Sequence, residues 1–121
     1  FCLHAPSKVV AVLIGNLIRN AVDAMEGEGS ITLEIIPEGA QVHVDVTDTG
    51  KGIPTSQHRT VFQPGFTTKK RGWGLGLSLS KRIVEQYHDG KIMVKKSAPG
   101  KGTTFRISLN QGALRGALVR E

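Results

Sequence analysis

The chain has 121 residues, 39% of them hydrophobic, and a formal net charge of +6 at pH 7. This length supports one hydrophobic core and excludes a two-domain chain. A single cysteine, Cys2, excludes an intramolecular disulfide and a cysteine-based zinc site, and no apolar run approaches the ~18 residues that span a membrane. The positive charge suits an anionic ligand, whereas an aromatic content of 5% disfavours a stacking surface for single-stranded nucleic acid.

The first predicted element is a helix over 8–26, because apolar residues recur there at helical spacing. Ser7 is the expected N-cap of this helix. Two segments with alternating apolar residues follow, 30–36 and 41–48. They predict a β-hairpin with its turn at 37–39.

A glycine-bearing stretch over 49–74 comes next, with one short helical segment predicted near 56–62. A second helix is predicted over 75–88, followed by strands over 91–97 and 103–109. Four strands and two helices predict an α/β (α+β) two-layer sandwich with the helices on one face of the sheet.

The predicted elements define one domain over 1–109. The remaining residues, 110–121, have no partner element and are expected to form a tail outside the domain. The chain begins with Phe1 rather than Met, which indicates a piece of a longer protein.

Asn16, Asn20 and Asp23 lie on one side of the first helix, at spacings of i, i+4 and i+7. Asparagine is a poor helix former, so two of them in an apolar helix suggest a row of oxygen donors. Mg²⁺ accepts such donors and shares its coordination with substrate phosphates. A solvated helix face with an Arg19–Asp23 ion pair explains the pattern equally well.

Asp48, Gly50 and Gly52 form a D-x-G-x-G pattern directly after a predicted strand. Glycine permits a positive φ and lets a ligand approach the backbone. An ionised carboxylate only accepts hydrogen bonds, so Asp48 suits an amino group such as that of adenine. The alternative is an Asx-turn that closes the strand.

Gly72, Gly74 and Gly76 run straight into the second predicted helix. Free backbone N–H groups and the helix dipole at such a position attract phosphate. The spacing matches neither the P-loop nor the dinucleotide-binding fingerprint, and a flexible turn is the alternative. Lys69 and Arg71 precede these glycines, either as part of a lid over the phosphates or as a solvated charge run.

Five segments in a fixed order carry a resemblance to a known family. They are N-L-I-R-N-A-V-D-A, D-T-G-K-G-I, V-F-Q-P-G-F-T-T-K, G-W-G-L-G-L-S-L-S and G-K-G-T-T-F. Together, from Ser7 to Leu109, they resemble the catalytic ATP-binding domain of sensor histidine kinases. The resemblance implies the Bergerat (GHKL) fold, with a mixed, mostly antiparallel sheet, and it implies ATP and Mg²⁺ as ligands.

The resemblance also implies roles for single residues. Asn20 would be the Mg²⁺ ligand, and Asp48 would bind the adenine amino group. Asn16 stands where gyrase-like ATPases carry a Glu that activates water, and asparagine has no titrating carboxylate for that task. Thr103 or Thr104 would help bind adenine through water. The remaining implied ATP-binding residues shape the pocket, the lid and the phosphate loop: Gly50, Gly52, Phe66, Lys69, Arg71, Gly72, Gly74, Leu75 and Gly76.

Phe62 and Phe66 match the phenylalanine box, which positions the lid in this family. The lid is short, as in kinases of the nitrogen-regulation type. Three positions depart from the family's commonest pattern. Asp23 stands where many members carry Lys, Gly65 replaces an aromatic residue, and Trp73 replaces a small one.

The implied function is to bind Mg-ATP and donate its γ-phosphoryl group to a His on a separate helical dimerisation domain, with a response regulator downstream. The acceptor His and the general base are expected on that domain, so no catalytic residue is assigned here. His43 is expected at the surface of a strand. The domain is expected to be cytoplasmic, without a nucleic-acid partner or membrane insertion. A gyrase-like ATPase, an anti-sigma serine kinase and a non-catalytic ATP-sensing module are the alternatives.

Overall fold

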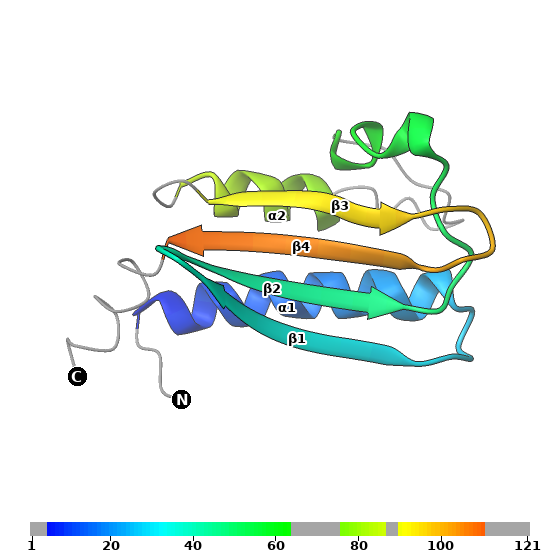
Figure 1. Ribbon diagram of the computed structural model, residues 1–121, viewed down its shortest axis with the longest axis horizontal. Helices are drawn as coiled ribbons and strands as arrows, with labels where there is room; N and C mark the ends of the chain where they lie inside the picture. Colours follow the sequence, from blue (N-terminus) through cyan, green and yellow to red (C-terminus); the bar gives the residue numbers. More distant parts are fainter. Residues whose placement is uncertain (1–4, 64–75, 87–89, 111–121) are drawn as a thin grey trace.

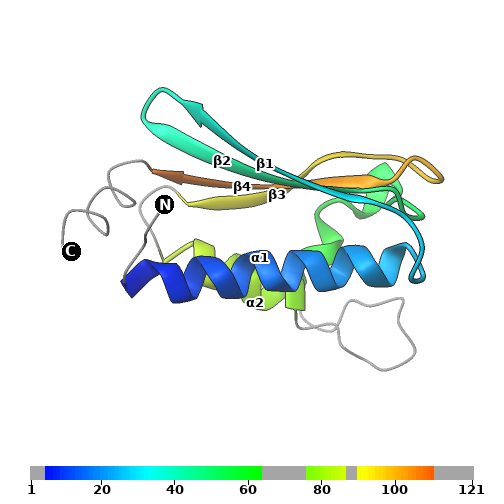
Figure 2. The ribbon, with the colours of Figure 1, turned by 90° about the horizontal axis from the view of Figure 1, so that it is seen from below.

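A four-stranded sheet and two helices on one of its faces form two layers (Figure 1, Figure 2). The computed structural model describes residues 5–63, 76–86 and 90–110. The three strand pairings among these residues are all antiparallel, in the order β1-β2-β4-β3. The described sheet is therefore antiparallel rather than mixed, and the predicted two-layer sandwich is confirmed. The elements are α1 (Ala5–Ala24), β1 (Ile31–Glu38), β2 (Gln41–Asp48), η1 (Thr55–Gln57), η2 (Thr60–Phe62), α2 (Gly76–Val84), β3 (Lys91–Ser97) and β4 (Thr103–Asn110).

Helix α1 begins earlier than the sequence pattern predicts. Ser7 lies inside the helix, so the predicted N-cap is wrong. Pro6 is accommodated because the first turn of a helix has backbone N–H groups without intrahelical partners, and a proline there loses no bond. The helix ends at Ala24, and Glu26 (φ 55°) and Gly27 (φ 86°) then turn the chain toward β1.

The β1–β2 hairpin turns at Gly39 and Ala40, not at 37–39 as predicted. Glu38 pairs with Gln41, which leaves a two-residue turn with Gly39 at φ 59°, a conformation suited to tight hairpins. Pro37 stays within β1. Proline has no backbone N–H. An edge strand tolerates it where that side of the residue faces solvent and no ladder hydrogen bond is lost.

Helix α2 is shorter than the predicted 75–88. It ends at Val84, and the Gln86 N–H then donates to the carbonyl of Ile83 at 3.1 Å, the tight i→i−3 pattern that closes many helices. Leu75 and residues 87–89 lie outside the described part of the chain.

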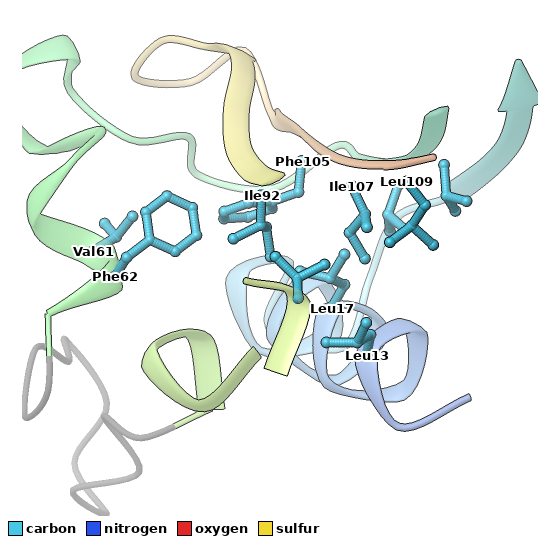
Figure 3. Close-up of a cluster of buried hydrophobic side chains, with 11 residues drawn as sticks. Leu13, Leu17, Val61, Phe62, Ile92, Phe105, Ile107 and Leu109 are labelled. Carbon is cyan, nitrogen blue, oxygen red and sulfur yellow. The ribbon is translucent and has the colours of Figure 1, made fainter. Parts of the chain in front are cut away.

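The core fills the space between the helices and the helix-facing side of the sheet (Figure 3). Leu13 and Leu17 form an i, i+4 stripe on α1 and are 1% and 0% exposed. Phe105 of β4 meets Phe62 of η2 in a T-shaped contact, with ring centroids 6.1 Å apart and planes at 84°, a preferred aromatic geometry. The other members of the cluster are Val44, Val46, Val61, Val84, Ile92, Ile107 and Leu109.

Strand β1 carries apolar side chains that the helices do not cover. Leu33 and Ile35 pair with Val46 and Val44, so they face the helix side of the sheet, yet they are 47% and 57% exposed. Figure 2 shows β1 curving away from α1 toward its turn with β2. The core is therefore centred on β2 and β4.

Candidate functional site

Three segments that are distant in the sequence meet at one end of the sheet, where β2 and α1 end and β4 begins (Figure 1). The Lys51 N–H donates to the carbonyl of Ala24, the last residue of α1, at 3.1 Å. The Gly102 N–H donates to the Gly50 carbonyl at 3.1 Å, and the Gly100 N–H to the Lys51 carbonyl at 2.7 Å. The loop after β2 is thus held between the end of α1 and the β3–β4 turn.

Asp48 is the last residue of β2 and is 3% exposed. Its Oδ1 accepts the Gly50 N–H at 2.8 Å, so the Asx-turn considered from the sequence is present. The backbone N–H of Thr103 also donates to the carboxylate. Burial raises the pKa of Asp48 above its ordinary value, and the two N–H donors oppose this effect without cancelling it. A carboxylate has about four acceptor positions, so two hydrogen bonds leave capacity for a ligand.

The two glycines of the D-x-G-x-G pattern are required by close backbone packing. A Cβ on Gly50 would lie 2.7 Å from the carbonyl oxygen of Ala24. Gly52 has φ 78°, and a Cβ there would collide with the carbonyl oxygen of Ala98. The sequence pattern predicts that these glycines let a ligand approach. In the structure they allow the backbone of Ala24 and Ala98 to pack closely against the loop beside Asp48.

The asparagine row of α1 divides between two environments. Asn16 is half-buried and its Nδ2 donates to Oγ of Ser80 at 3.2 Å. Ser80 is fully buried on α2, so this bond ties the two helices together. Asn20, also half-buried, lies one turn nearer the end of α1 that contacts the Asp48 loop, and Asp23 is exposed.

The structure separates the two threonines that the sequence left as alternatives. Thr103 pairs with Asp48 across β2 and β4, so both side chains are on the same face of the sheet, and Thr103 is 3% exposed. Thr104 points to the opposite face because side chains alternate along a strand. Its Oγ1 lies 2.9 Å from Oγ1 of Thr47. Thr103 joins Asp48 at this site, and Thr104 does not.

The other predicted site residues are distributed as follows. Gly76 is the first residue of α2, and Phe62 packs in the core at 8% exposure. The predicted lid and phosphate-loop residues, and the departures Gly65 and Trp73, lie outside the described part of the chain: Phe66, Lys69, Arg71, Gly72, Gly74 and Leu75.

A second polar cluster lies on the face of the sheet away from the helices. Asp45, 2% exposed, accepts from Arg106 at 2.8 and 3.0 Å and from Lys95 at 3.1 Å. Burial alone would raise the pKa of Asp45, but these hydrogen bonds and positive charges outweigh it and lower the pKa. His43, expected at the surface, is 5% exposed, and its Nδ1 lies 2.7 Å from Oγ of Ser108. The cluster joins β2, β3 and β4 on the outer face.

Comparison with known proteins gives a consistent family. A family model described as histidine kinase-, DNA gyrase B-, and HSP90-like ATPase matches residues 7–113. Sensor histidine kinase ZraS of Escherichia coli (strain K12) is 45% identical over 104 residues, which cover 86% of this chain and 22% of that protein. Sporulation kinase A of Bacillus subtilis (strain 168) is 44% identical over 93 residues, covering 77% of this chain and 15% of that protein. The chain thus spans less than a quarter of the length of either of these curated relatives.

Solved structures agree with the sequence relatives. The nucleotide-free catalytic domain of histidine kinase ThkA superposes with a TM-score of 0.73 at 34% identity, covering 88% of this chain and 68% of that one. The mycobacterial sensor histidine kinase MprB gives a TM-score of 0.72 at 27% identity, covering 82% and 68%. Within the described residues, neither helix is both long and apolar enough to cross a membrane. The chain belongs to the histidine kinase-, DNA gyrase B- and HSP90-like ATPase family, as an ATP-binding catalytic domain of the sensor histidine kinase type.

Proposed function

We propose that this domain binds Mg-ATP at the Asp48 end of the sheet and presents the γ-phosphoryl group to a His on a separate helical dimerisation domain. The observation that carries the proposal is the buried Asp48 carboxylate, which only accepts hydrogen bonds and sits at the junction of β2, β4 and α1. In an ATP-binding family, this is a suitable group for the exocyclic amino group of adenine.

Adenine recognition at this site would depend on acceptors. Asp48 would accept the amino group, and Thr103 lies beside it on the same face of the sheet. Gly50 and Gly52 hold the loop that supports the carboxylate. A purine with a carbonyl at the same position would place an acceptor against an acceptor and would bind more weakly.

The magnesium ion would be held by oxygen. In the described part of the chain no three His, Cys, Asp or Glu side chains gather in a metal-binding group. The amide oxygen of Asn20 is the hard donor that Mg²⁺ accepts, and phosphates and water complete such a shell. When bound, the ion neutralises charge on the phosphoryl groups during transfer.

The phosphates would lie toward α2. Its N-terminus at Gly76 offers backbone N–H groups and the positive end of the helix dipole. We assign further phosphate and lid contacts to residues outside the described ranges: Phe66, Lys69, Arg71, Gly72, Gly74 and Leu75.

Phosphoryl transfer, rather than hydrolysis, is supported by Asn16. Its side chain has no carboxylate to activate water, and its amide nitrogen is bonded to Ser80. The acceptor His and the general base would come from the dimerisation domain, so the isolated chain is not expected to phosphorylate itself. A response regulator would receive the phosphoryl group next. We place the domain in the cytoplasm. Asn110, which was expected to begin the tail, is the last residue of β4 and pairs with Gln41, so it belongs to the domain. The rest of the expected tail, 111–121, lies outside the described residues.

The proposal is tested by calorimetric titration of a non-hydrolysable ATP analogue with and without Mg²⁺. Asp48→Asn is expected to weaken binding by ~1.5–3 kcal/mol, the contribution of a hydrogen bond to a charged group. Asp45→Asn is the matched control, because it makes the same change on the same strand but on the opposite face. It is expected to retain the wild-type affinity at a temperature where the variant is folded.

Absence of ATP binding by the wild-type chain, or equal effects of the two substitutions, would contradict the proposed site. Kinase activity is tested separately, by adding a helical dimerisation domain that carries the acceptor His and following radiolabelled phosphate. A chain that binds ATP and transfers no phosphate to any such domain would be a non-catalytic ATP-sensing module.

A further inference from the structure

Ser97, the last residue of β3, contacts three groups beside the candidate site. Its Oγ receives the Ile53 N–H at 2.7 Å and donates to the Gly102 carbonyl at 3.0 Å. It also lies 2.8 Å from Oγ1 of Thr103. Ile53 follows the Asp48 loop and Gly102 ends the β3–β4 turn, so a single hydroxyl connects the segments that surround Asp48.

The valence of the hydroxyl fixes the direction of each hydrogen bond. A serine hydroxyl has one proton and two lone pairs, a backbone N–H only donates, and a carbonyl only accepts. The proton of Ser97 must therefore go to Gly102, and one lone pair receives the N–H of Ile53. The other lone pair is left for Thr103, so the Thr103 hydroxyl must donate its own proton to Ser97.

This arrangement leaves the Thr103 hydroxyl with acceptor capacity only. Its proton is directed at Ser97, and whatever is placed against its oxygen has to donate to it. Asp48, on the same face and paired with Thr103, is also an acceptor when ionised. A water molecule between them would point both of its protons at these oxygens and turn its lone pairs to the ligand. Whether the ligand contacts these oxygens directly or through that water molecule, it must supply a hydrogen-bond donor.

We propose that Ser97 is a specificity-determining positioning residue, which holds the Thr103 hydroxyl as an acceptor so that the site selects a 6-amino purine over a 6-oxo purine. The inference rests on the proposed function and identifies how that site would distinguish its nucleotide. Without the Ser97 hydroxyl, the proton of Thr103 is free to rotate and can donate to a carbonyl.

The test compares Ser97→Thr with Ser97→Val in the full chain. Threonine and valine have nearly the same shape, and threonine has a hydroxyl where valine has a methyl group. Both are β-branched and therefore suit a strand. Calorimetry gives the dissociation constants of ATP and inosine triphosphate, which carries a carbonyl at position 6, for each variant. Ser97→Thr is expected to retain the wild-type preference for ATP, and Ser97→Val to lose about tenfold of it, the typical effect of one hydrogen bond.

Several outcomes would decide the matter. Equal preference ratios in the two variants, with ATP still bound, would overturn the role of Ser97 and leave the proposed function intact. A purely structural role would weaken both nucleotides alike and leave the ratio unchanged, which also overturns the inference. If the wild-type chain binds neither nucleotide, the proposed function fails and this inference with it. Thermal unfolding checks that the variants fold, and Ser97→Ala against wild type gives the same comparison without adding an atom.

Discussion

At the scale of single residues, β2 holds two buried aspartates whose pKa values shift in opposite directions. Asp48 and Asp45 are 3% and 2% exposed, but they point to opposite faces of the sheet because side chains alternate along a strand. Asp45 meets the cations of Arg106 and Lys95, which lower its pKa against the effect of burial. For Asp48, burial dominates two backbone donors and raises the pKa. Among the described residues, cations therefore compensate the charge of Asp45 on the outer face, whereas the partners of Asp48 at the candidate site are two backbone N–H groups.

Asp48→Asn is expected to make the nucleotide-free domain at least as stable as the wild type at neutral pH. A raised folded-state pKa means that ionisation of Asp48 opposes folding. Stability is lost as the pH rises from the unfolded value of about 3.9 through the raised folded value. Asparagine keeps an acceptor oxygen for the Gly50 N–H, which donates to Oδ1 of Asp48, and has no charge. Thermal unfolding at pH 7 and pH 4 checks this, and a variant that is less stable than the wild type at pH 7 would contradict it.

Asp45→Asn is expected to act in the opposite direction and destabilise the domain by about 2 kcal/mol at neutral pH, because charged hydrogen bonds from Arg106 and Lys95 are lost. A lowered folded-state pKa gives stability that is fully present above the unfolded value of about 3.9 and is lost as the pH falls through the folded value. Urea unfolding over a pH series should therefore show the difference narrowing in acid. A constant difference at all pH values would count against this assignment.

At the scale of elements, α1 and β1 both carry apolar stripes but bury them to different extents. Leu17 of α1 is fully buried against the sheet, whereas Ile35 of β1 is 57% exposed although it faces the helix side. The difference follows from the order of the strands, which puts β1 at an edge where the sheet curves away from α1 (Figure 2).

Leu17→Ala is expected to cost ~2–5 kcal/mol of unfolding free energy, as for other fully buried leucines. Ile35→Ala removes a comparable side chain and is expected to cost less than about 1 kcal/mol, because most of that side chain is already in solvent. Urea denaturation of both variants measures the contrast. Similar costs would show that β1 is covered in solution.

The loop between β2 and η1 depends on glycine for contact as well as for conformation. Gly52→Ala is expected to destabilise the domain by more than ~1–2 kcal/mol, the cost of a left-handed L-residue, because its Cβ also collides with the Ala98 carbonyl. It should weaken ATP binding as well, since the loop supports Asp48. Gly39→Ala is the control: it also has a positive φ, of 59°, but open space around it and a position in the hairpin turn. Equal losses of affinity would refute the packing argument.

At the scale of the whole molecule, the sequence predicts what depends on local pattern and fails where a position depends on neighbours in space. Strong alternation placed β2 and β4 almost as observed. The local pattern predicts Ser7 as an N-cap, but the helix begins before it, because a proline fits in a first helical turn. The pattern also predicts a turn at Pro37, but this residue stays in β1, because an edge strand tolerates proline.

The candidate site shows the same limit. D-x-G-x-G pointed to Asp48, but the choice between Thr103 and Thr104 requires the register of β4 against β2, which the pattern does not contain. Ser97 and Ser80 carried no signal at all, because their roles come from partners 6 and 64 residues away in the sequence.

The order β1-β2-β4-β3 has a consequence for how the domain folds. β1–β2 and β3–β4 are hairpins that close locally, and the β2–β4 ladder is the strand pairing that joins them among the described residues. Asp48 and Thr103 lie on opposite sides of that seam, so neither hairpin alone contains both residues of the proposed base-binding surface. Closing a long loop is the slow step in such topologies, and a nucleotide bound across the seam stabilises only the assembled state. Nucleotide affinity should therefore appear in the last kinetic phase of refolding, when the two hairpins dock.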